Sequence, residues 1–229
     1  MSFELDPFLL FTYPQPDPCV SDIDPDSPYE RTQITCRTNR GHLRAGKRLS
    51  NLDLIIPCEP VPDVVFTWMS ECLVRDRVLQ VFREERVTGF STQPAKGRIA
   101  TTGSPVGLTE LLVTGWGGMA PEASGIREVE RCQDCGHLRY SGLEEPRDLI
   151  DSKNWDGSDF FMIWPLPRYR FVTNRVAEIC RKHSITGVAL ERNFPVPSGR
   201  IIPGYTPGRL SHYFPPERAH ALGDPLDIA

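Results

Sequence analysis

Two cysteines in the chain have the spacing of metal ligands. Cys132 and Cys135 are separated by two residues, and Gly136 follows them directly. In a CxxCG turn of this kind the glycine allows backbone amides to turn toward both thiolates. Such a turn supplies two ligands, whereas a tetrahedral zinc ion needs four. The sequence must therefore supply two more ligands from elsewhere.

An internal repeat indicates where those ligands are. Residues 41–44, Gly-His-Leu-Arg, recur as residues 136–139, and Cys36 lies ahead of the first copy as Cys132 and Cys135 lie ahead of the second. In the first copy Asn39 occupies the second cysteine position, and Arg40 is inserted before the glycine. Three cysteines then leave one ligand to be found, which either His42 or His137 could supply. The predicted metal ligands are Cys36, His42, Cys132 and Cys135.

These four side chains predict one structural Zn²⁺ ion and no other cofactor. By analogy with zinc-finger peptides, the ion would contribute about 10 kcal/mol to folding. The alternative is that the metal has been lost and that the thiols remain reduced. A catalytic zinc is not expected, because nothing nearby in the sequence is typical of a general base.

The repeat continues beyond the cysteines and predicts the elements that position them. Residues 63–68 match 159–164, residues 74–78 match 172–176, and residues 87–90 match 185–188, all in one order. Each copy predicts a turn of the CxxCG type, an apolar strand, an amphipathic helix and a closing strand. We therefore expect an α+β fold in which two tandem, pseudo-symmetric units share a mixed or antiparallel sheet. The units span about residues 32–95 and 127–192.

The repeat also bears on domain organisation. The chain has 229 residues and 22 prolines, about twice the average share of proline. We expect a single domain over residues 1–229, with proline-rich termini and a Pro/Gly-rich segment, 193–229, that wraps over the core. The glycine-rich stretch 101–118 is expected to form turns between strands.

Composition excludes several classes of protein. The formal net charge is −4, which argues against a general nucleic-acid-binding protein. No apolar run approaches the roughly 18 residues that a membrane span needs, so no membrane association is expected. The N-terminus lacks the basic start and apolar stretch of a secretory signal, and the seven cysteines are odd in number and scattered. These features predict a cytoplasmic protein without a disulfide framework, in which Cys72 and Cys180 are small buried side chains.

An enzymatic role has little support in the sequence. The five histidines show no HExxH pattern, and no GxSxG motif is present. The prediction is that the protein is not an enzyme and has no catalytic residues.

The motifs resemble those of the double-CXXCG motif family, a large set of paralogues best known in myxobacteria. The resemblance covers roughly residues 131–190 well and 35–90 more faintly. The departure at Asn39 and Arg40 alters the first CXXCG motif. The residues that carry the resemblance are 132–136, 146–150, 155–161, 171–176 and 185–188.

The resemblance implies a function. Several members of this family resemble or serve as immunity proteins, which bind and neutralise a toxin delivered between neighbouring cells. We therefore expect an immunity protein that acts as a stoichiometric antitoxin against a cognate protein toxin encoded by an adjacent gene. The resemblance implies no catalytic residue. Two other functions stay open: a zinc-ribbon-like nucleic-acid-binding module, and a hydrolase that reverses the toxin's modification of its target.

Acidic side chains are the expected partner-binding groups, because charge complementarity speeds encounter with a basic toxin cleft. One surface is the acidic N-terminal segment, and a second lies after the CxxCG turn. The alternative is that the N-terminal acids pack against the chain's own basic stretch, residues 31–48. The predicted partner-binding residues are Asp22, Asp24, Asp26, Glu144 and Glu145.

Overall fold

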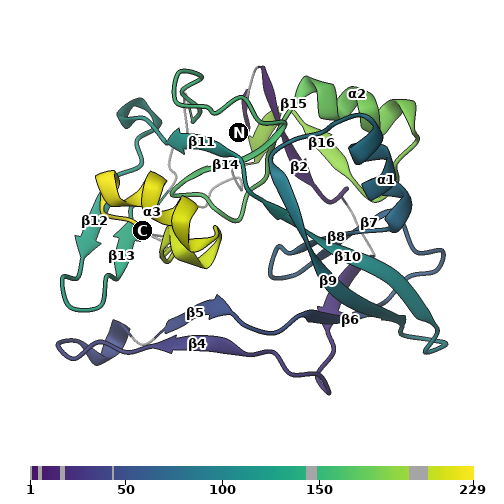
Figure 1. Ribbon diagram of the computed structural model, residues 1–229, viewed down its shortest axis with the longest axis horizontal. Helices are drawn as coiled ribbons and strands as arrows, with labels where there is room; N and C mark the ends of the chain where they lie inside the picture. Colours follow the sequence, from purple (N-terminus) through teal and green to yellow (C-terminus); the bar gives the residue numbers. More distant parts are fainter. Residues whose placement is uncertain (1, 5–6, 16–18, 43, 143–148, 196–205) are drawn as a thin grey trace.

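Strands dominate the computed structural model, which describes residues 2–4, 7–15, 19–42, 44–142, 149–195 and 206–229 (Figure 1). Six of the strands close a barrel whose interior is filled by a small apolar cluster that includes Leu52, Leu54 and Leu73. The neighbouring pairs are antiparallel except β3 with β7 and β6 with β9. In order around the barrel the strands are β10 (Pro105–Val113), β8 (Cys72–Val74), β7 (Val64–Thr67), β3 (Val20–Ile23), β6 (Leu52–Ile56) and β9 (Phe90–Ile99).

A second, five-stranded sheet lies beside the barrel. Its strand β14 (Phe160–Trp164) is buried at all five positions, as expected for a continuous apolar run covered on both faces. The strand order is β11 (Trp116–Met119), β14, β15 (Phe171–Thr173), β2 (Phe8–Thr12) and β16 (Ala189–Glu191).

Two α-helices of equal length cover one end of these strands. Helices α1 (Asp76–Glu84) and α2 (Asn174–Lys182) lie near each other in Figure 1. Both are amphipathic, and both bury their apolar faces in one core cluster with Phe11 and Phe160. The spacing predicts burial of Val78, Val81 and Phe82 in α1 and of Val176, Ile179 and Cys180 in α2, and all six are buried. Leu79 and Ala177 are buried as well.

Three small two-stranded sheets complete the fold. Two are hairpins, β4 (Arg31–Ile34) with β5 (Arg44–Arg48) and β12 (Glu128–Arg131) with β13 (Leu138–Tyr140). The third pairs β1 (Ser2–Glu4) with β17 (Asn193–Pro195). Three short 3₁₀ helices are η1 (Arg40–His42), η2 (Glu122–Ser124) and η3 (Leu210–His212).

The C-terminal segment packs on the five-stranded sheet. Helix α3 (Pro216–Gly223) and the 3₁₀ helix η4 (Asp224–Leu226) end the chain, and Leu210, Phe214 and Ile228 join the core cluster of that sheet. None of the helices in the described part of the chain has the length and apolar character needed to cross a membrane.

The expected α+β fold of two units around a shared sheet is wrong. The chain forms a closed six-stranded barrel and several separate sheets, with 35% of residues in strands and 19% in helices. The matching segments form matching antiparallel pairs, β7 with β8 (Val64 opposite Val74) and β14 with β15 (Phe160 opposite Val172), but the two pairs belong to different sheets. Their further neighbours differ, because β8 pairs with β10 in the barrel and β15 pairs with β2 in the five-stranded sheet. Short sequence matches predict local strand pairs, but they do not determine which sheet the pairs join.

Two aspartates at matching positions form corresponding contacts. Asp63 forms an ion pair with Arg77 and accepts a hydrogen bond from the hydroxyl of Thr186 (2.8 Å). Asp159 pairs with Arg175 (2.7 Å) and accepts from the hydroxyl of Thr88 (3.2 Å). Each aspartate is thus bonded by a threonine from the other matching segment. These contacts join α1 to the turn that follows α2, and α2 to the turn that follows α1.

The cysteines fall into three groups. Cys19 and Cys58 form a disulfide. The odd number of cysteines predicted no disulfide framework, but an odd total does not prevent one pair from forming a bond. Cys72 and Cys180 are free and buried, as expected. Burial raises the pKa of the Cys72 thiol to about 11 and that of Cys180 to about 12. The remaining cysteines, Cys36, Cys132 and Cys135, lie together.

Candidate metal centre

The two hairpins bring together the four side chains that the sequence predicts as metal ligands. Cys36 follows β4 and His42 precedes β5, while Cys132 and Cys135 lie in the turn between β12 and β13. The ligand atoms of Cys36, His42, Cys132 and Cys135 all lie within 4.8 Å of one another, so this group could hold a metal ion.

The distances between ligand atoms match a small tetrahedral site. The Sγ atoms of Cys36 and Cys132 are 3.6 Å apart, and Cys135 Sγ lies 3.7 Å from His42 Nδ1. With Zn–S bonds of about 2.3 Å and Zn–N bonds of about 2.0 Å, tetrahedral geometry separates two sulfurs by about 3.8 Å and a sulfur from a nitrogen by about 3.5 Å. The observed spacings need little adjustment to hold such an ion.

The second turn favours a thiolate at Cys132. Backbone N–H groups of Cys135 and Asp134 donate to this sulfur and lower the pKa of Cys132 to about 6. Gly136 adopts a positive φ of 65°, a conformation that side-chain-bearing residues avoid, and its N–H donates to the carbonyl of Cys132 (3.0 Å). The glycine therefore closes the turn that directs amides at the metal-binding sulfur.

Asp134 connects the two turns. Its carboxylate accepts hydrogen bonds from the backbone N–H groups of Arg37 (2.6 Å) and Thr38 (3.3 Å) in the first hairpin, and one from the thiol of Cys36 (3.2 Å). The Cys36 contact, followed by the Arg37 amide, holds the pKa of Asp134 below its usual range. This residue, between the two cysteines of the CxxC motif, was not among the predicted site residues.

His42 is oriented by a carboxylate behind it. Its Nε2 lies 2.9 Å from Glu130 Oε1, and Arg139 donates to the other oxygen of that carboxylate (2.9 Å). Metal-binding histidines commonly make this contact, which fixes the tautomer and the ring orientation. Burial disfavours the charged ring, but hydrogen bonds to Cys132, Cys36 and Glu130 outweigh it and raise the pKa of His42.

Asn39 explains how the first turn works without a second cysteine. Its Oδ1 accepts from the N–H of Gly41 (2.9 Å), and its Nδ2 lies 3.0 Å from His42 Nε2. The backbone N–H of Asn39 also donates to Cys36 Sγ (3.3 Å). The asparagine thus shapes the turn that brings His42 to the place where a second thiolate would otherwise lie.

The structure distinguishes the two histidines that the sequence left open. Only His42 belongs to the group that contains the cysteines, because its Nδ1 faces Cys135. The His137 ring stacks on the His42 ring, with centroids 4.1 Å apart and planes 7° from parallel. His137 therefore supports the ligand instead of replacing it, although it also groups with Glu130 and His42.

The predicted partner-binding acids have different environments. Asp22 and Asp26 are exposed, whereas Asp24 is buried and paired with Arg98 (2.8 Å), which holds the pKa of Asp24 below its usual range. Glu144 and Glu145 lie outside the described residues. Within the basic stretch 31–48, two arginines pair with Glu71 and Glu110, not with the N-terminal acids.

No known family model matches this chain. The search among curated proteins also gives no match. The resemblance to the double-CXXCG motif family therefore rests on the motif residues themselves and stays a prediction.

Proposed function

We propose that this protein is an immunity protein that neutralises a cognate bacterial toxin in the cytoplasm by direct stoichiometric binding, and that a structural zinc ion joins its β4–β5 and β12–β13 hairpins. The ligand set of three sulfurs and one nitrogen carries the zinc part of the proposal. Four protein ligands complete a tetrahedral zinc site, whereas catalytic zinc sites keep a position open for water or substrate. A closed site favours a role in folding over a role in chemistry.

Two surface features support a binding role. Trp68 is 68% exposed and Met69 is 45% exposed, side by side in the turn between β7 and β8. Tryptophan is enriched among residues that dominate binding energy at protein interfaces. The exposed Asp22 and Asp26 add negative charge that suits a basic toxin surface.

Metal analysis tests the zinc part of the proposal. Protein purified without a chelator should contain about one equivalent of zinc, because the four-ligand site is strong enough to survive purification. Cys132→Ser and Cys135→Ser should each reduce the content below about 0.3 equivalents. Cys180→Ala, which removes a buried thiol outside the site, serves as the control. Wild-type protein with less than about 0.3 equivalents would rule out the structural zinc.

Co-expression with the product of the adjacent gene tests the binding part. That product should be toxic alone, and the two proteins should co-purify at equal stoichiometry while growth is restored. Trp68→Ala should weaken the complex, whereas Leu226→Ala, which removes a smaller exposed apolar side chain on η4, should not. A harmless neighbour, or two proteins that do not associate, would refute the immunity function.

The same experiment separates the alternatives. Rescue by substoichiometric protein would indicate a hydrolase that reverses the toxin's modification. Binding of DNA or RNA with a steep dependence on salt would indicate a nucleic-acid-binding module.

A further inference from the structure

A cleft lies apart from the metal centre, where the barrel, the β4–β5 hairpin and the C-terminal segment meet. Its volume is about 410 Å³, and none of the four metal ligands lines it. Small-molecule sites usually have volumes of about 300–1,000 Å³ and occur preferentially between structural units. The size and the place of this cleft are therefore those of a ligand site.

The charge of the cleft is opposite to that of the whole chain. Five lysine and arginine side chains line the cleft together with two carboxylates, Glu71 and Glu110. The chain as a whole has a net charge of −4. A local excess of positive charge on an acidic protein concentrates anions at that place. The lining cations are Arg31, Lys47, Arg48, Arg168 and Arg170.

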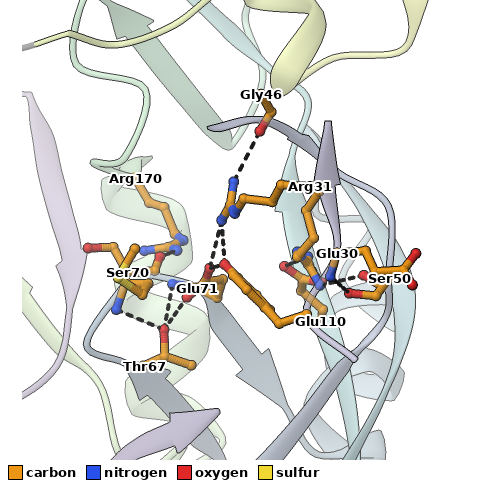
Figure 2. Close-up of polar contacts among 12 residues, drawn as sticks. Glu30, Arg31, Gly46, Ser50, Thr67, Ser70, Glu71, Glu110 and Arg170 are labelled. Atoms are coloured by element: carbon orange, nitrogen blue, oxygen red, sulfur yellow. Dashed lines mark hydrogen bonds and ion pairs between the residues drawn. The ribbon is translucent and has the colours of Figure 1, made fainter. Parts of the chain in front are cut away.

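The carboxylates in the cleft hold two of these arginines in place. Glu110 is 2% exposed and accepts a hydrogen bond from Arg48 (2.6 Å). Glu71 pairs with Arg31 (3.7 Å), which also donates to the carbonyl of Gly46 (3.3 Å). Figure 2 shows Arg31 reaching from its strand toward Glu71 and Gly46. The guanidinium groups are thus held before any ligand binds.

Arg170 is held on another side of the cleft. It donates to the carbonyl of Ser70 and stacks its guanidinium over the Phe66 ring, 5.6 Å from the centroid. Figure 2 places Arg170 beside Ser70, across Glu71 from Arg31. Preorganised arginines lose little entropy when they bind an anion, and their planar groups match phosphate and carboxylate oxygens.

Two further cations remain available to a ligand. Lys47 and Arg168 are exposed, and neither forms an ion pair with another residue in the part of the chain that the structure describes. Other lining residues are apolar or aromatic, among them Leu112, Val113 and Tyr213. The Tyr213 hydroxyl donates a hydrogen bond to the backbone carbonyl of Pro207, and this bond fixes the tyrosine ring. The cleft therefore offers cations together with an apolar, partly aromatic wall.

We propose that this cleft binds a small organic phosphate that carries a flat apolar group, with the size and chemistry of a nucleotide. The phosphate would lie against Lys47 and Arg168 beside the fixed arginines, and the flat group would contact Tyr213 and Val113. None of the four metal ligands lines this site, and the proposal does not rest on toxin binding, although Met69 lines the cleft.

Calorimetric titration of the full, zinc-loaded protein tests the site. The probes are the four ribonucleoside monophosphates, the corresponding nucleosides and inorganic phosphate, each at low salt. At least one nucleotide should bind at a ratio of one to one, and about tenfold more tightly than its nucleoside or phosphate alone, because only the nucleotide uses both parts of the cleft. No binding, or equally tight binding of phosphate alone, would refute the proposal.

Matched double variants locate the binding. Lys47→Gln with Arg168→Gln should weaken nucleotide binding about tenfold, since two charge-assisted contacts are lost. Lys153→Gln with Arg181→Gln changes the net charge equally at exposed positions outside the cleft and should leave the affinity within about twofold. An equal loss in both double variants would show a general charge effect and would overturn the assignment.

Discussion

At the scale of single residues, the candidate metal centre groups three thiols with one imidazole where two complete CxxCG turns would supply four thiols. Cys132 and Cys135 occupy a complete CxxCG turn, whereas Asn39 stands where the first turn would have its second thiolate. The short helix η1 brings His42 into the same space, and Asn39 contacts its ring. The grouping of these four side chains could be predicted because the CxxCG spacing is local and the repeat of Gly-His-Leu-Arg marks the second turn.

The groups behind the ligands could not be predicted in the same way. Glu130 lies on β12 and contacts His42 of the other hairpin, and Arg139, on the paired strand β13, donates to Glu130. Their positions depend on how two hairpins pack, and spacing along the chain carries no information on that. The register of β12 against β13 shifts between Glu128 and Glu130, so regular alternation along the strand gives no signal for the position of Glu130.

Glu130→Gln tests the role of this carboxylate. A neutral amide stabilises the zinc-bound imidazole less, so zinc affinity should fall about 10- to 100-fold while the stoichiometry at saturation stays the same. Competition with a chromogenic chelator measures the change. Glu128→Gln is the matched control, because Glu128 pairs with Arg131 instead of His42. Equal effects of the two substitutions would contradict the role of Glu130.

At the scale of elements, the sequence predicted those helices and strands whose formation depends on the pattern of neighbouring residues. The apolar run of β14 and the amphipathic spacing of α1 and α2 suffice to predict those elements. The region 101–118 was expected to form turns, yet residues 105–113 form the long strand β10. That strand pairs with β9 in a hairpin and with the more distant β8, and these hydrogen bonds outweigh the turn preference of Gly107.

Asp63→Asn tests the contacts that join Arg77 on α1 to Thr186 in the turn after α2. Burial alone would raise the pKa of Asp63, but the hydrogen bonds from Arg77 and Thr186 outweigh it and hold the pKa below its usual range. The substitution should reduce the free energy of unfolding at pH 7 by about 1–2 kcal/mol, a modest value because Arg77 is half exposed to water.

The pH dependence of that loss follows from the sign of the shift. A carboxylate with a depressed pKa in the folded state stabilises the fold above its unfolded pKa of about 3.9, and this contribution disappears as the pH falls through the folded value. The wild type and Asp63→Asn should therefore converge in urea unfolding below about pH 3. Asp22→Asn, at an exposed position, should change little at any pH. A difference that persists at low pH would contradict this explanation.

Gly187→Ala tests the turn that carries Thr186. Gly187 has a positive φ of 80°, and an added Cβ would lie 2.1 Å from the carbonyl oxygen of Val64. The clash with backbone cannot be relieved by a side-chain rotation, so we expect a loss of about 3 kcal/mol or more in urea unfolding. Gly107→Ala meets nothing within 4 Å and should change the free energy by less than about 1 kcal/mol. Similar effects at both glycines would disprove the steric argument.

At the scale of the whole molecule, the candidate metal centre lies between two hairpins. Among the described residues, β4 and β5 pair only with each other, and so do β12 and β13. Few contacts hold the first hairpin to the rest of the described structure, and they include the ion pairs of Arg31 with Glu71 and of Arg48 with Glu110. An isolated two-stranded hairpin is marginally stable in water. The metal ion would therefore supply much of the local stability of both hairpins.

Removal of the metal should consequently destabilise the two hairpins and leave the rest of the fold intact. After treatment with a chelator, amide hydrogen exchange should accelerate in residues 31–48 and 128–140, because opening these hairpins no longer costs the energy of the metal bonds. Strand β14 and helix α2 should keep their protection, since their stability comes from the buried core. Added zinc should restore the slow exchange.

Reduction of the Cys19–Cys58 disulfide in zinc-loaded protein is the control, and it should leave both hairpins protected. Equal acceleration in β14 and in the hairpins would show instead that the ion stabilises the fold as one cooperative unit.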